Sequence, residues 1–242
     1  MPSWQWESPA GQRVTRLLHR EAITHSQLTH PNILPFLGIY YEEVGSPPLT
    51  VLPLMEGGSL EELIAKSPIE PDAFKCILFG ISSGVVHLHS RCPPVIHGDL
   101  HPGNVLIDSA GNPILCDFGL SRIRHEVTRT RTIIQEAGRL RFLAPELSGG
   151  LTKSFRTSPS SDIFSLAMTF LNTWSGQQPF SQCHKEVKAA SYIRKGRRPE
   201  MPSDGVSLDP KPKRLLWGLI CEMWAQEPDA RPSSSGVFAQ LR

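Results

Sequence analysis

The spacing of apolar residues along the 242-residue chain predicts several helices. Residues 13–29 place Leu17 and Leu28 on one stripe, and a longer helix begins at Pro71, since proline suits the first helical turn. Residues 162–174 are apolar almost all round, which is typical of a buried helix. Shorter helices are predicted at residues 59–65, 214–224 and 233–241, whereas residues 1–12 show no period and are expected to be loose.

Two pairs of short apolar runs predict neighbouring strands. Residues 34–41 and 49–54 are separated by the turn-forming stretch Gly-Ser-Pro-Pro, and residues 104–107 and 114–116 by Ser-Ala-Gly-Asn. Helices dominate from residue 57 onward. The order of elements therefore predicts an α+β fold in which a small mixed part precedes a larger, mainly helical part.

Composition adds mainly exclusions. The chain has 25 Lys and Arg against 23 Asp and Glu, a net charge of +2 that gives no argument for nucleic-acid binding. The longest uncharged run, residues 163–184, contains several Asn, Gln and Ser residues, and we expect no membrane span. The five cysteines are scattered without a CxxC spacing, which argues against a disulfide framework or zinc site and favours an intracellular, cytoplasmic location.

The strongest chemical signal lies between residues 95 and 120. The stretch HGDLHPGN contains Asp99 and Asn104, and the stretch DFG begins at Asp117. Phosphoryl transfer needs a carboxylate that receives or orients the acceptor hydroxyl, and oxygen ligands for Mg²⁺ near the phosphates. Asp99 fits the first role, and Asn104 and Asp117 fit the second. Each stretch alone could be an ordinary turn, but the two at this spacing form a specific pattern.

These motifs resemble the catalytic domain of eukaryotic protein kinases, most closely the tyrosine-kinase-like group. Ala144-Pro145-Glu146 resembles the APE motif, and Asp229-Ala230-Arg231-Pro232 resembles a late Arg-Pro motif of the family. The resemblance implies a structural ion pair between Glu146 and Arg231, and makes Asp162 the anchor at the start of the family's buried F helix. His97 and His101 become neighbours of Asp99 in the catalytic loop.

The resemblance also implies a nucleotide site and two lobes. Glu21 resembles the glutamate of the C helix, Leu52 stands at the gatekeeper position, Met55 lies in the hinge, and Leu106 resembles the apolar floor under adenine. The implied cofactors are ATP and Mg²⁺. Residues 13–242 then form one kinase-like domain, with a partial small N-lobe and hinge at residues 13–56 and a mainly helical C-lobe at residues 57–242.

Several family features are missing from this sequence. No GxGxxG stretch occurs, and the first lysine is Lys66, whereas the family carries a strand lysine before the C helix. Gly98 stands where many kinases have Arg, and His101 stands where Ser/Thr kinases have a catalytic-loop Lys. Arg139 stands where those kinases have a Thr that contacts the catalytic Asp. Since the phosphate clamp contributes strongly to binding and rate, ATP binding is expected to be weak.

Three functions remain open from the sequence. The first is a protein kinase that phosphorylates protein hydroxyls in intracellular signalling, with Ser or Thr favoured over Tyr. The second is a pseudokinase, a binding scaffold without turnover. The third is a small-molecule phosphotransferase, because HGDLHPGN also resembles the loop of aminoglycoside- and choline-kinase-like enzymes; the APE and Arg-Pro motifs argue against it. The expected partners are a protein substrate or a regulatory protein, with no nucleic acid and no membrane.

Overall fold

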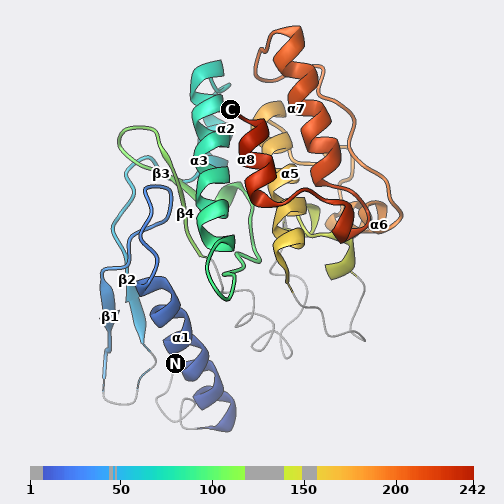
Figure 1. Cartoon of the computed structure of the whole chain (residues 1–242). Helices are drawn as coiled ribbons and strands as arrows, with labels where there is room; N and C mark the ends of the chain where they lie inside the picture. Colours follow the sequence, from blue (N-terminus) through green and yellow to red (C-terminus); the bar gives the residue numbers. More distant parts are fainter. Residues whose placement is uncertain (1–7, 44–45, 47, 118–138, 149–156) are drawn as a thin grey trace.

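The computed structural model describes residues 8–43, 46, 48–117, 139–148 and 157–242 (Figure 1). Its first helix, α1 (Pro9–Ser26), begins four residues before the predicted start at residue 13. The Ser8 hydroxyl accepts a hydrogen bond from the Gly11 amide at 3.1 Å, and Pro9 occupies the first turn. Both features start helices. The expectation of a loose segment is therefore wrong for residues 9–12, and residues 1–7 lie outside the described residues.

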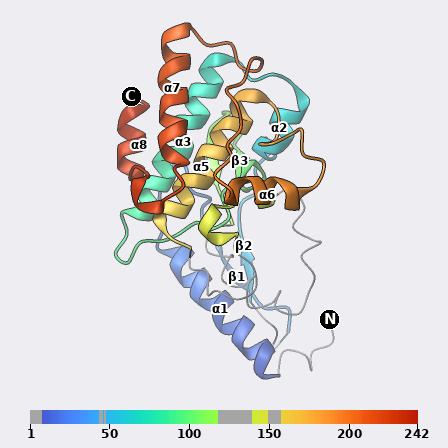
Figure 2. The ribbon, with the colours of Figure 1, turned by 90° about the vertical axis from the view of Figure 1, so that its right-hand side faces the viewer.

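The small mixed part contains the first predicted strand pair. β1 (Gly38–Tyr40) pairs with β2 (Leu49–Val51) in antiparallel orientation, with Gly38 opposite Val51, and both strands are shorter than predicted. Tyr40 and Leu49 are 56% and 51% exposed, so this pair is not part of the core. Figures 1 and 2 show α1, β1 and β2 at one end of the molecule, away from the later helices.

The larger part is mainly helical, as predicted. One helix was not predicted: α6 (Glu186–Arg194), whose buried stripe consists of Ala189, Ala190 and Ile193. No helix of the described residues is both long enough and apolar enough to cross a bilayer. The other helices are α2 (Leu60–Lys66), α3 (Pro71–His89), α5 (Pro159–Ser175), α7 (Pro210–Met223) and α8 (Ser234–Gln240).

The core of this part forms around α5. Every residue from Ser161 to Trp174 is buried, which agrees with the apolar pattern in the sequence. α5 packs against α3 and α7, and α3 also packs against α8 (Figure 1). Burial on all sides makes α5 the element against which the other helices and the loops before them are positioned.

A second strand pair lies on α3. β3 (Val105–Ile107) and β4 (Pro113–Leu115) are antiparallel, and β4 contacts α3. β4 and α3 approach closely at Gly84. A Cβ atom on this residue would lie only 2.7 Å from the Leu115 side chain, so a larger residue would not fit without a shift. The Leu115 amide also donates to the Asn32 carbonyl at 2.9 Å, and the Leu34 amide donates to the Leu115 carbonyl at 2.9 Å. These bonds join the small part to the helical part beside β4.

Candidate active site

The loop that carries Asp99 is fixed to the buried helix α5 by one carboxylate. Asp162, 1% exposed, accepts hydrogen bonds from the backbone amides of His97 and Gly98, both at 2.8 Å. Its Oδ2 also lies 2.9 Å from Nε2 of His89, at the end of α3. A buried carboxylate with several donors is strongly held in place. Asp162 therefore determines where the loop begins.

Asp99 lies near the polar side chains of Asn104, Arg139 and His101. Nδ2 of Asn104 donates to the Asp99 backbone carbonyl at 2.8 Å and to its Oδ2 at 3.2 Å. Nη1 of Arg139 forms an ion pair with the same Oδ2 at 2.8 Å, and Nε2 of His101 lies 3.9 Å from Oδ1. The Asp99 carboxylate is thus oriented from the loop by Asn104 and from a segment forty residues later by Arg139, and His101 lies nearby.

Asn104 and Asp117 lie at the same end of the β3–β4 pair. Asn104 comes directly before β3 and Asp117 two residues after β4, and the Cys116 amide donates to the Asn104 carbonyl at 3.1 Å. Burial, together with the carboxylates of Asp117 and Asp99, raises the pKa of the Cys116 thiol to about 12. Both carboxylates therefore lie close enough to Cys116 to act on one thiol. Asp99, Asn104 and Asp117 lie together, as the kinase resemblance implies.

The buried His97 ring lies next to this acidic site. Burial lowers the pKa of His97, although the carboxylates of Asp162, Asp99 and Asp117 each act to raise it. The ring is 0% exposed, so loss of solvation outweighs the three negative charges and the neutral form is favoured. The neutral ring also accepts a hydrogen bond at Nδ1 from the Asp99 backbone amide, at 3.4 Å, and so supports the loop from beneath.

The residues assigned to the adenine side form one apolar group. Leu52, Met55 and Leu106 pack against a buried cluster made of Leu34, Ile114 and Cys116. The carbonyl of Met55 also accepts a hydrogen bond from the Gly58 amide at 3.3 Å. This apolar group lies beside β4, the strand that leads to Asp117.

Glu21 lies on α1, half-buried, one turn before His25. Nε2 of His25 lies 2.6 Å from the Leu34 carbonyl oxygen. Burial lowers the pKa of His25, and the Asp117 carboxylate acts against that shift. The inward side of α1 therefore faces the end of the strand pair that carries Asp117.

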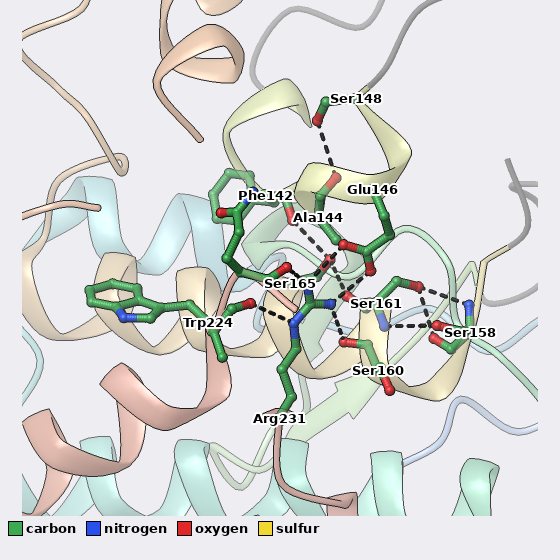
Figure 3. Close-up of polar contacts among 12 residues, drawn as sticks. Phe142, Ala144, Glu146, Ser148, Ser158, Ser160, Ser161, Ser165, Trp224 and Arg231 are labelled. Atoms are coloured by element: carbon green, nitrogen blue, oxygen red, sulfur yellow. Dashed lines mark hydrogen bonds and ion pairs between the residues drawn. The ribbon is translucent and has the colours of Figure 1, made fainter. Parts of the chain in front are cut away.

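Glu146 and Arg231 form a bidentate ion pair (Figure 3). Nη1 and Nη2 of Arg231 donate to the two carboxylate oxygens at 2.7 and 2.8 Å. The guanidinium also donates to the backbone carbonyls of Ser160, Ala225 and Gln226. This pair joins the short helix η5 (Pro145–Leu147) to α5 and to the segment after α7. It has the structural role that the resemblance implies.

Two arginines of the short helix η4 (Arg139–Arg141) make contacts that were not predicted from the sequence. Arg139 contacts Asp99, as described above. Arg141 is 4% exposed and donates to Glu186 at 2.5 Å and to the carbonyls of Pro179, Phe180 and Cys183. Their position before the APE motif was a signal that this segment borders the site.

Comparison with known proteins agrees with this geometry. A family model described as the protein kinase domain matches residues 7–241. The chain belongs to the protein kinase domain family. Its α+β fold, with a mainly helical C-lobe and a small N-lobe, is confirmed.

Curated relatives of this kinase domain include serine/threonine kinases. Receptor-interacting serine/threonine-protein kinase 2 of Bos taurus is 31% identical over 239 residues, which cover 95% of this chain and 42% of the relative. Receptor-interacting serine/threonine-protein kinase 4 of Mus musculus is 30% identical over 212 residues, 86% of this chain and 26% of the relative. Serine/threonine-protein kinase CTR1 of Arabidopsis thaliana is 30% identical over 240 residues, 96% of this chain and 27% of the relative.

These relatives are members of the tyrosine-kinase-like group. The predicted resemblance of this chain to that group is therefore confirmed. The chain spans less than half the length of each of them.

Proposed function

We propose that this kinase domain binds Mg²⁺ and ATP and transfers the terminal phosphoryl group to a Ser or Thr hydroxyl of a protein. The observation that carries the proposal is the grouping of Asp99, Asn104 and Asp117 at one end of the β3–β4 pair. All five cysteines are free thiols, which supports a cytoplasmic location.

The donor set fits a magnesium ion. The amide nitrogen of Asn104 donates to Asp99, so its amide oxygen is the atom left to meet a cation. Asp117 supplies a carboxylate at the same end of the strands. Mg²⁺ is commonly held by one or two protein oxygens together with substrate phosphates, whose charge it neutralises. Asn104 and Asp117 would hold the ion.

The remaining residues would act on the acceptor hydroxyl or contact the nucleotide. Asp99 would orient the acceptor hydroxyl and receive its proton, a role that requires an ionised carboxylate. Leu52, Met55 and Leu106 would cover the adenine ring with apolar surface. Leu52 then acts as the gatekeeper and Glu21 as the glutamate of the C helix.

Nucleotide titrations by calorimetry test this assignment. We expect weak ATP binding that requires Mg²⁺, because Asp117 and Asn104 are present whereas the chain has no GxGxxG stretch. Asp117→Asn should weaken binding of Mg²⁺ and ATP, and Asp204→Asn, at an exposed carboxylate, should leave it unchanged. Tight ATP binding without metal that Asp117→Asn does not alter would contradict the role of Asp117.

The ion pair between Arg139 and Asp99 favours a second candidate, a pseudokinase that binds partners without turnover. Arg139 holds Oδ2 of Asp99 at 2.8 Å, so it competes with an acceptor hydroxyl for this carboxylate. An acceptor that used Oδ2 would require Arg139 to move away. Equal phosphate incorporation with the wild type and with Asp99→Asn would support the scaffold function. Loss of incorporation in Asp99→Asn, with nucleotide binding intact, would support the kinase.

A further inference from the structure

The helix α6 and the turn after it carry a concentration of positive charge. Residues 184–200 contain six of the 25 Lys and Arg residues and two of the 23 acidic ones, so this segment has a net charge of +4 and the rest of the chain −2. We name its solvent-facing cations the α6 basic face. All are exposed, and they are Lys185, Lys188, Arg194, Lys195 and Arg197.

The acidic residue of α6 does not offset this charge. Glu186, in the first turn, points toward the buried Arg141, whose Nε lies 2.5 Å from its Oε1. The side chains of Arg141 and Glu186 are 5% and 20% exposed. Because Arg141 neutralises Glu186 inside the protein, the outer surface of α6 keeps its full positive charge.

Among the described residues, the cations of the α6 basic face have no acidic partners, and none of the five forms an ion pair. Instead, Lys188 and Arg197 lie over the ring of Tyr192, at 5.8 and 4.7 Å from its centroid. Such contacts hold the two cations in place while their charges stay available to a ligand. Uncompensated like charges repel one another, and an anionic partner would relieve that repulsion.

The location of this face connects it to the candidate active site. α6 packs against η4 and η5 (Figures 1 and 2). In η4, Arg139 contacts Asp99 and Arg141 contacts Glu186. The three-residue helix η4 therefore connects α6 to Asp99, the carboxylate that would orient the acceptor hydroxyl.

We propose that the α6 basic face binds an acid-rich segment of a protein, and that this segment belongs to the phosphoryl acceptor. The identification of the partner as the acceptor rests on the proposed function, whereas the docking itself requires no turnover. Acidic side chains complement the charge of the five cations. Such complementarity raises the rate at which two proteins associate and disfavours partners of the wrong charge.

Fluorescence anisotropy with a labelled acidic peptide of about 12 Asp and Glu residues tests the docking at low salt, where charge interactions reach farthest. Wild-type protein should bind this peptide, and binding should weaken as NaCl is raised to about 150 mM. Lys188→Glu/Arg197→Glu should weaken binding at least about tenfold, because two attractions become repulsions. Lys185→Glu/Lys195→Glu should do the same without disturbing the Tyr192 ring.

The matched control is Lys211→Glu/Arg214→Glu, which changes net charge equally at the start of α7 and should retain wild-type affinity. Equal weakening by this control, or no binding at low salt, would overturn the proposal. Tighter binding of single-stranded polynucleotide or of anionic vesicles than of the peptide would overturn it too. ATP titration of the α6 variants separates the two proposals, since their nucleotide binding should be unchanged whether or not the peptide binds.

Discussion

The ion pair between Glu146 and Arg231 allows a quantitative test of the structure. Glu146→Gln keeps the shape of the side chain and removes its charge. The Arg231 side chain is 0% exposed, so the variant leaves a buried guanidinium without its carboxylate. Breaking a buried pair in this way typically costs about 3–5 kcal/mol. Arg231 retains three carbonyl acceptors and Glu146 is 28% exposed, so we expect a loss of about 3 kcal/mol in the free energy of unfolding, at the lower end of that range.

Urea unfolding and thermal unfolding measure this effect. For a domain of this size, about 3 kcal/mol corresponds to a Tm lowered by roughly 6–12 °C. Asp72→Asn is the matched control, because it removes the same charge from an exposed ion pair, in which the side chains of Asp72 and Lys75 are 97% and 65% exposed. It should cost less than about 1 kcal/mol. Equal losses in the two variants, or less than about 1 kcal/mol for Glu146→Gln, would refute the reasoning.

Three further outcomes follow from the site. Asp162→Asn should lower the free energy of unfolding in urea by at least about 3 kcal/mol, because one amide oxygen cannot replace two buried carboxylate oxygens. Burial lowers the pKa of His97, so the unfolded chain takes up the proton first. The contribution of neutral His97 to the free energy of unfolding is therefore fully present above about pH 6.5 and is lost as the pH decreases further. Measurements at about pH 7.5 and about pH 5.5 should show a lower Tm at the lower pH. Arg139→Thr should raise phosphoryl transfer to a protein substrate, since the Asp99 oxygen becomes accessible, and should lower Tm, because the Asp99 side chain is only 14% exposed and loses its cation; an unchanged rate would contradict a blocking role.

Local sequence signals predicted much of the fold and site. The strand pairs and the buried helix α5 follow from short apolar patterns, and Asn104 and Asp117 come together because they flank two strands that pair with each other. The early start of α1 also had a local signal, Ser8 followed by Pro9, which the apolar stripe alone does not include.

The features that the sequence did not predict depend on contacts between distant segments. α6 escaped prediction because its buried stripe contains two small alanines, which give little periodic contrast. The resemblance places Arg139 beside the catalytic Asp, but the ion pair that it forms with Asp99, forty residues earlier in the chain, depends on tertiary packing. The neutralisation of Glu186 by Arg141 is likewise a property of tertiary packing.

The three hydrogen bonds to Asp162 have a consequence for motion in solution. The amides of His97 and Gly98 are tied to a helix that is buried on every side, so exchanging their protons with solvent requires the loop to separate from α5. Amides of this kind exchange only when a whole cooperative unit of the structure opens. The amides of His97 and Gly98 should therefore exchange at the same slow rate as the amides of α5. The candidate catalytic carboxylate of Asp99, the next residue, would then move with the core of the domain.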